Sequence, residues 1–68
     1  MSWTRSAYPG LMKNLPVAVR NKAIEIANSI LQEKSDMEET TIITTAILRA
    51  KEWADNYLKF PAPETNPG

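Results

Sequence analysis

The side chains that most often perform chemistry are few in this sequence of 68 residues, and they are not grouped. It contains no Cys and no His, so it lacks a thiolate and the commonest general base and zinc ligand. Glu25 and Glu33 fall on a polar helix face, and Glu38 with Glu39 precedes a helix, so neither pair predicts two converging carboxylates. Both glycines lie near the chain ends and form no phosphate-binding loop. We therefore expect no enzyme, catalytic residue, cofactor or metal site.

Basic side chains are the candidates for contact with an anion. These are Arg20, which projects from the apolar side of a predicted helix, and Arg5 and Lys13 in the N-terminal segment. With Trp3 and Tyr8 nearby, they would also suit stacking and phosphate contacts with single-stranded nucleic acid. The net charge is zero, which disfavours that function because phosphate contacts dominate such binding. We expect the stem of Arg20 to cover apolar surface while its guanidinium reaches a carboxylate or carbonyl of the N-terminal segment.

Two helices with helical spacing of apolar residues must position these side chains. Pro16 suits a helix start because its φ is already helical. The helical spacing of apolar residues predicts the first helix over residues 17–33. The second runs from 38 to 58. Residues 40–45 are β-branched and would otherwise favour a strand, but no second strand exists to pair with them. The predicted apolar faces comprise Val17, Val19, Ala23, Ile24, Ile26, Ala27, Ile30 and Leu31, then Ile42, Ile43, Ala46, Ile47, Ala50, Trp53, Ala54, Tyr57 and Leu58.

The connection between the helices is short, so we expect them to be antiparallel neighbours. Asp36, followed three residues later by Glu39, is typical of a capping box at the start of the second helix. Small residues near the middle of both faces predict close approach of the two backbones. Trp53 is the large residue of this face, and we expect it to anchor the core.

Residues 1–15 are expected to form an ordered arm with short helical turns, broken at Pro9-Gly10. A two-helix hairpin of this size has a stability near zero by itself, so either the arm or a second copy must complete its core. Trp53 and Tyr57 are placed to receive an aromatic side chain of the arm. The large apolar residues of the arm are Trp3, Tyr8, Leu11, Met12 and Leu15.

The predicted fold class is therefore all-α, a small antiparallel helical hairpin closed by an ordered N-terminal arm. Residues 1–60 are expected to form a single small helical domain. Residues 61–68, which are rich in proline, are expected to be a disordered C-terminal tail. No segment has the apolar length of a signal peptide or a membrane span, so we expect a cytoplasmic protein without membrane contact.

The predicted function is that of a non-enzymatic helical protein-interaction module, adaptor or regulatory, whose protein partner is unknown. Leu48 lies on the polar side of the second helix with Thr41, Thr44 and Thr45 around it, and these four residues are the candidate partner-binding surface. Residues 1–34 carry five basic and two acidic residues (+3), whereas residues 35–68 carry three basic and six acidic (−3). This asymmetry favours either folding of the two halves on each other or head-to-tail pairing between chains, as in weak self-association. A chance imbalance of solvated charges is the alternative, because screened surface pairs contribute only about 0–1 kcal/mol. The alternative is an accessory nucleic-acid-associated protein that uses the basic, aromatic N-terminal half.

Six short segments of the chain form a recognisable set: Trp3-Thr4, Tyr8-Pro9, Met12-Lys13-Asn14-Leu15, Val19-Arg20, the run from Lys22 to Asn28, and the run from Ala50 to Ala54. With these segments the chain resembles the small bacterial YdaT-type proteins and, more loosely, the ChaB family named for cation-transport regulation. This resemblance implies a small α-helical domain and supplies no catalytic residues.

Overall fold

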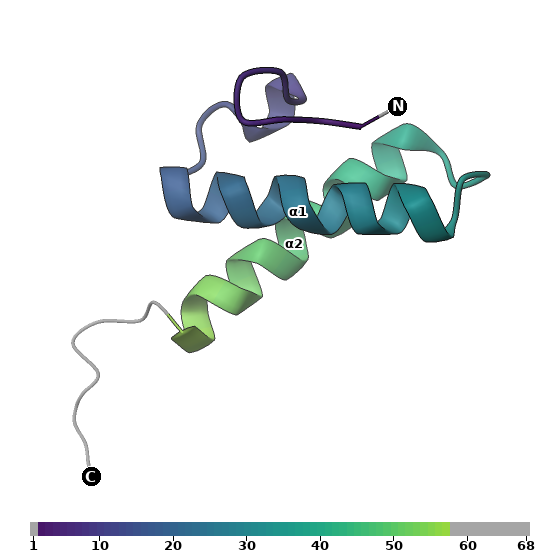
Figure 1. The fold of residues 1–68 in the computed structure, drawn as a ribbon. Helices are drawn as coiled ribbons and strands as arrows, with labels where there is room; N and C mark the ends of the chain where they lie inside the picture. The colour runs from purple at the N-terminus through teal and green to yellow at the C-terminus, as the bar shows by residue number, and fades with distance from the viewer. Residues whose placement is uncertain (1, 58–68) are drawn as a thin grey trace, which may run out of the picture.

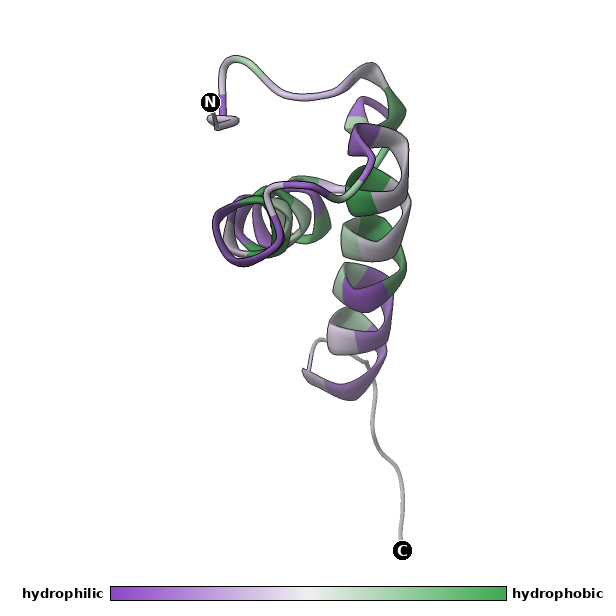
Figure 2. Cartoon of the chain, turned by 90° about the vertical axis from the view of Figure 1, so that its right-hand side faces the viewer, coloured by the Kyte–Doolittle hydropathy of each residue, from purple (hydrophilic) through white to green (hydrophobic). Residues whose placement is uncertain are grey.

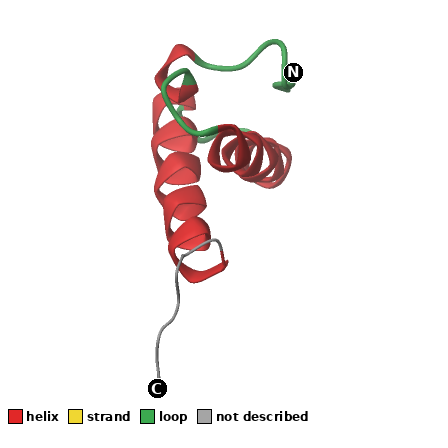
Figure 3. Cartoon of the chain, turned by 90° about the vertical axis from the view of Figure 1, so that its left-hand side faces the viewer, coloured by secondary structure: helices red, strands yellow, loops and turns green. Residues whose placement is uncertain are grey.

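The computed structural model describes residues 2–57, in which three helical elements follow one another. They are the 3₁₀ turn η1 (Gly10–Met12), α1 (Val17–Glu33) and α2 (Glu39–Tyr57). The chain reverses direction between α1 and α2, and the described part consists of helices and loops without a strand (Figures 1 and 3). The predicted all-α helical hairpin is confirmed. Leu58, the end of the predicted domain at residue 60 and the tail predicted at 61–68 lie outside the described residues.

Helix α1 begins and ends where the sequence predicts. Pro16 has an extended ψ of 151° and therefore caps the helix instead of forming its first residue, and its carbonyl accepts the Arg20 N–H at 2.8 Å. At the other end, the Lys34 N–H donates to the Ile30 carbonyl at 2.7 Å. These are the first and last i→i−4 hydrogen bonds of the helix, and they mark its two ends.

Helix α2 begins two residues later than a capping box at Asp36 requires, so that prediction was wrong. The Met37 N–H donates to the Lys34 carbonyl at 3.0 Å, which extends the turn, and the first helical bond joins the Ile42 N–H to the Glu38 carbonyl. The β-branched segment at 40–45 is helical, as predicted. Here the Thr44 hydroxyl donates to the Thr40 carbonyl at 2.6 Å, a local bond that threonine often makes inside a helix.

The core lies where α1 and α2 cross. Four alanines, Ala23 and Ala27 of α1 with Ala46 and Ala50 of α2, are fully buried, which confirms the predicted close approach of the two helices. Hydrophobic residues of α2 gather in the half that lies beside α1 (Figure 2). The buried cluster consists of Met12, Val19, Ala23, Ile24, Ala27, Ile42, Ile43, Ala46 and Ala50.

Away from the crossing the helices diverge, and the apolar residues there are not in the core. Helix α2 crosses α1 obliquely, and its C-terminal part runs away from it (Figure 1). Trp53 is only half-buried and lies outside the buried cluster, while Tyr57 is 74% exposed. The prediction that Trp53 anchors the core was therefore wrong. Val17, the first residue of α1, lies on the same side of the molecule, away from the turn, and is 61% exposed for the same reason.

The N-terminal arm packs on the helix pair, as predicted. Met12 of η1 is fully buried, and Trp3, Tyr8 and Leu15 pack against the core. Leu11, which we expected to pack as well, is 63% exposed. The arm lies over α1 on the side opposite the C-terminal part of α2 (Figure 1). Within the described residues the Trp53 ring pairs with Tyr57 and with neither Trp3 nor Tyr8, so the expected contact with an aromatic side chain of the arm was wrong.

Candidate functional site

The outer surface of α2 carries the residues that the sequence predicts for partner binding. Leu48 is 59% exposed. Thr41 and Thr44 are exposed as well, and Thr45 is half-buried. Residues 40–48 contain no charged side chain, so a partner can cover this surface without removing water from an ion. We call the four residues Thr41, Thr44, Thr45 and Leu48 the α2 outer surface.

The hydroxyl of Thr44 makes this surface less polar than its sequence indicates. Because the hydroxyl donates its proton to the Thr40 carbonyl at 2.6 Å, this donor does not require a partner in water. What Thr44 then offers to a neighbour is its methyl group and an acceptor oxygen. The α2 outer surface is therefore suited to apolar contact around Leu48, and it holds no group that could transfer a proton near neutral pH.

Arg20 contacts the N-terminal arm. Its guanidinium carbon lies 4.9 Å from the centre of the Tyr8 ring, a cation–π arrangement. This confirms that Arg20 reaches the arm, although its partner is an aromatic face, not the expected carboxylate or carbonyl. The Arg20 Nε is buried and has no hydrogen-bond partner in the described part of the protein. Arg20 therefore holds Tyr8 against α1.

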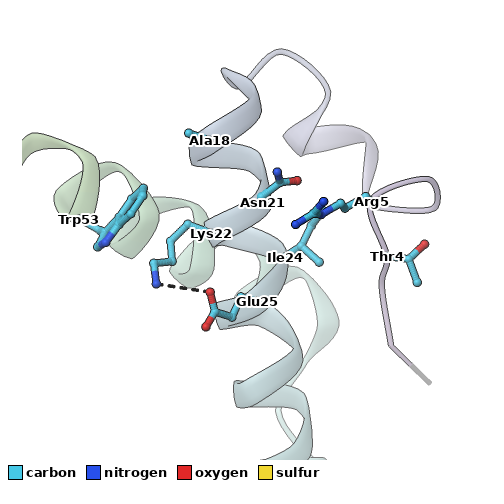
Figure 4. Close-up of a pocket in the computed structure, with 8 residues that line it drawn as sticks. All are labelled: Thr4, Arg5, Ala18, Asn21, Lys22, Ile24, Glu25 and Trp53. Carbon is cyan, nitrogen blue, oxygen red and sulfur yellow. Dashed lines mark hydrogen bonds and ion pairs between the residues drawn. The ribbon is translucent and has the colours of Figure 1, made fainter. Parts of the chain in front are cut away.

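The other two candidate anion contacts have different surroundings. Arg5 is exposed and lines an open hollow of about 400 Å³ together with Asn21 and Lys22 of α1 and Trp53 of α2 (Figure 4). Lys13 is exposed directly after η1. The structure thus places Arg5 beside α1, Lys13 at the end of η1 and Arg20 over Tyr8. Trp3 and Tyr8 are both half-buried against the core, which favours packing of these rings over stacking on bases.

Lys22, one of the basic residues of the nucleic-acid alternative, makes two contacts that the sequence analysis did not predict. Its ammonium group lies 3.3 Å from the Glu25 carboxylate and 5.0 Å from the centre of the Trp53 ring (Figure 4). The spacing of Lys22 and Glu25, three residues apart in a helix, predicts their ion pair. The contact with Trp53 depends on how the helices cross, and no local pattern reveals it.

Asn28 is the second residue that sequence analysis missed. The Trp3 N–H donates to the Asn28 Oδ1 at 2.8 Å, and the Asn28 Nδ2 donates to the Trp3 carbonyl at 2.9 Å. An Asn on the polar face of a helix is ordinary, so the residue type does not identify Asn28 as a contact. The sequence indicates only that an ordered arm must be attached to the helices at some residue. Asn28 fixes the start of the arm to the middle of α1.

The described residues form neither a metal-binding cluster nor a membrane-spanning helix. Within residues 2–57, no three Asp or Glu side chains gather closely enough to hold a metal ion. Neither of the two long helices in that range is both long and apolar enough to cross a membrane.

A comparison with curated proteins finds a similar protein in Bacillus subtilis (strain 168), described as "Uncharacterized protein YdaT". The two are 46% identical over 56 residues, which are 82% of this chain. The match covers 36% of that protein, so the chain spans about a third of its relative's length. The resemblance to YdaT-type proteins is thereby confirmed. No protein-family model matches the chain, and no solved structure matches it.

Proposed function

We propose that this chain, a homologue of the B. subtilis protein YdaT over most of its residues, is a non-enzymatic helical module that binds other protein chains. Its binding surface is the α2 outer surface, and the partner to which we commit is a second copy of the chain. The observation that carries the proposal is the 59% exposure of Leu48 within a stretch of nine uncharged residues, 40–48. A single exposed leucine is ordinary, but its neighbours toward the N-terminus of α2, Thr44 and Thr45, are uncharged and keep the cost of desolvation low there.

Charge complementarity supports a second copy as the partner. Residues 2–34, which form the arm and α1, carry five basic and two acidic residues, a net charge of +3. Residues 35–57, mostly α2, carry two basic and five acidic residues, a net charge of −3. The α2 of one copy therefore attracts the arm and α1 of another.

The basic half of the molecule also offers apolar side chains opposite which Leu48 can pack. Leu11 of η1 is 63% exposed, and Val17, the first residue of α1, is 61% exposed. In this arrangement Leu48 of one copy packs on Leu11 and Val17 of the next. The contact is small, so we expect weak association, with a Kd of about 0.1–1 mM.

Sedimentation velocity over protein concentrations from about 10 μM to about 1 mM tests this function. We expect the parent chain to self-associate, and both Leu48→Glu and Val17→Glu to weaken the association at least about tenfold, because each buries a carboxylate in the contact. Ser29→Glu is the matched control, since it adds the same charge at an exposed position near the other end of α1.

The expected result for Ser29→Glu is association equal to that of the parent chain. A parent chain that stays monomeric throughout the range, or a Leu48→Glu variant that associates like the parent, would overturn the proposed contact. Raising the salt concentration should also weaken the association, because charges on the surface are screened.

A further inference from the structure

The contact between Asn28 and Trp3 has the chemistry of a site that binds an extended peptide. Both hydrogen bonds join the Asn28 carboxamide to the main chain of Trp3, one to its N–H at 2.8 Å and one to its carbonyl at 2.9 Å. Two residues of neighbouring antiparallel strands exchange the same pair of bonds. Because main-chain groups are alike in every residue except proline, these bonds select an extended conformation and not a particular side chain.

A groove beside Asn28 provides the selectivity for an aromatic side chain. Trp3 is half-buried, packs against the core and lines a hollow of about 220 Å³ with Leu31 of α1, Met37 of the turn and Ile42 of α2. These apolar residues surround the space next to the indole ring. We call Asn28, Leu31, Met37 and Ile42 the Trp3 groove.

The part of the arm that fills this groove is attached separately from the rest of the arm. Residues 4–7 are exposed and are held by bonds among themselves, with the Thr4 N–H donating to the Ala7 carbonyl at 2.9 Å and the Ala7 N–H to the Thr4 carbonyl at 3.2 Å. Met12 is buried beyond them. The four residues 4–7 can span about 13 Å when extended. Trp3 can therefore leave the groove while Tyr8 stays over Arg20 and Met12 stays in the core.

We propose that the Trp3 groove binds the N-terminal arm of a second copy of this chain, so that two copies are joined by exchange of their arms. The structure shows the arm seated in this groove in cis, and the same contacts form in trans. Exchange therefore preserves every contact in the groove and opens only the exposed Thr4–Ala7 turn. The arm of the same chain competes at an effective concentration in the millimolar range, which keeps the parent chain closed at low concentration.

This site is distinct from the α2 outer surface, and the experiment separates the two. All chains in the test carry Leu48→Glu, which suppresses the contact proposed above. The acceptor chain also carries Trp3→Ala, which leaves Asn28 intact and the groove without its indole. The donor chain carries Asn28→Leu instead, which frees its own arm but keeps Trp3.

We expect a one-to-one complex when acceptor and donor are mixed, with an affinity at least about tenfold higher than the self-association of either chain alone. Size-exclusion chromatography with light scattering measures the mass, and far-UV circular dichroism checks that each chain is folded. A mixture that contains only monomers of folded chains would overturn the proposal.

A peptide keeps the proposal testable if the donor chain does not fold. The probe is a fluorescently labelled peptide with the sequence of residues 2–8, and its anisotropy is measured against the acceptor chain. We expect it to bind the acceptor at least about tenfold more tightly than a chain with Leu48→Glu alone, in which the arm occupies the groove. The same peptide with Trp3→Ala should bind at least about tenfold more weakly.

Asn28→Asp in the acceptor provides the matched test of the main-chain contact. Aspartate keeps an oxygen that accepts from the N–H of the bound residue, but it loses the amide that donates to the carbonyl. We expect this change to weaken binding of the peptide several-fold. A peptide that does not bind the acceptor, or binds it equally with Asn28→Asp, would overturn the assignment of the groove.

Discussion

The middle and the C-terminal end of α2 are bound to the rest of the protein in opposite ways. At the crossing, small residues are buried completely, since Ala46 and Ala50 of α2 and Ala23 and Ala27 of α1 have no exposed surface. At the diverging end, the largest side chains of the helix remain accessible, with Trp53 half-buried and Tyr57 74% exposed. The comparison shows that in a pair of helices burial depends on how close the helix axes lie. The size of a side chain does not decide it.

The interactions at the crossing and at the diverging end differ in kind as well. At the crossing, the absence of large side chains lets the backbones approach, and Met12 of the arm and Ile42 fill the remaining space as the largest fully buried residues. At the diverging end, Trp53 is held by Lys22 at 5.0 Å and by the Tyr57 ring at 6.5 Å. Contacts of this second kind contribute only about 0.5–1.5 kcal/mol each.

Met12→Ala should have the largest effect on stability. Met12 is fully buried, and truncation of a buried methionine costs about 2–5 kcal/mol. A domain of this size without disulfides or metals has a stability of about 3–5 kcal/mol, so we expect the variant to be largely unfolded. Urea denaturation followed by far-UV circular dichroism measures the change. Leu11→Ala is the control and should stay close to the parent, because Leu11 is exposed. A parent-like midpoint for Met12→Ala would show that the arm is not part of the core.

Ala46→Leu tests the close approach at the crossing directly. The larger side chain has no space between the helices, since Ala46 is fully buried, and overpacking of this kind costs about 1–3 kcal/mol. Ala18→Leu, at an exposed position of α1, serves as the control and should change the stability little. If Ala46→Leu were as stable as the parent in thermal denaturation, the helices would be further apart than the structure has them.

Trp53→Ala should destabilise the protein less than the upper limits expected for Met12→Ala and Ala46→Leu. The variant loses the contacts with Lys22 and Tyr57 but opens no cavity in the core, so we expect a loss of about 1–2 kcal/mol. Trp53 as a core anchor, which the sequence predicts, would instead imply about 3–5 kcal/mol. The midpoint of urea denaturation, again followed by circular dichroism, distinguishes the two values. An unfolded Trp53→Ala variant would restore the prediction made from the sequence.

Local patterns in the sequence are sufficient to predict the helices and their facing alanines, because helical periodicity and small residues are properties of neighbouring positions. They do not predict where the apolar faces stop touching. Trp53 and Val17 continue the apolar periods of their helices, yet the oblique crossing leaves both outside the core. The same limit applies to the candidate sites. Exposure of Leu48 follows from its position on the helix, whereas the pairing of Asn28 with Trp3, 25 residues apart, depends on the tertiary path of the arm.

The smallest effect expected concerns the charges at the diverging end. Lys22 lies between Glu25 and Trp53, so Glu25→Gln removes an ion pair and leaves the cation over the ring. The Glu25 side chain is 70% exposed, and an exposed pair contributes at most about 0.5 kcal/mol, which added salt reduces further.

Lys22→Met keeps an apolar stem over Trp53 but removes the positive charge. A double-mutant cycle that combines Lys22→Met with Trp53→Ala isolates the coupling between the two side chains. We expect a coupling of about 0.5–1 kcal/mol, the value for a cation–π contact that water reaches, because Lys22 is only partly buried. A coupling near zero would mean that α2 swings free of α1 beyond the crossing. A coupling above about 2 kcal/mol would mean that the contact is desolvated and that the diverging end closes as tightly as the alanine crossing.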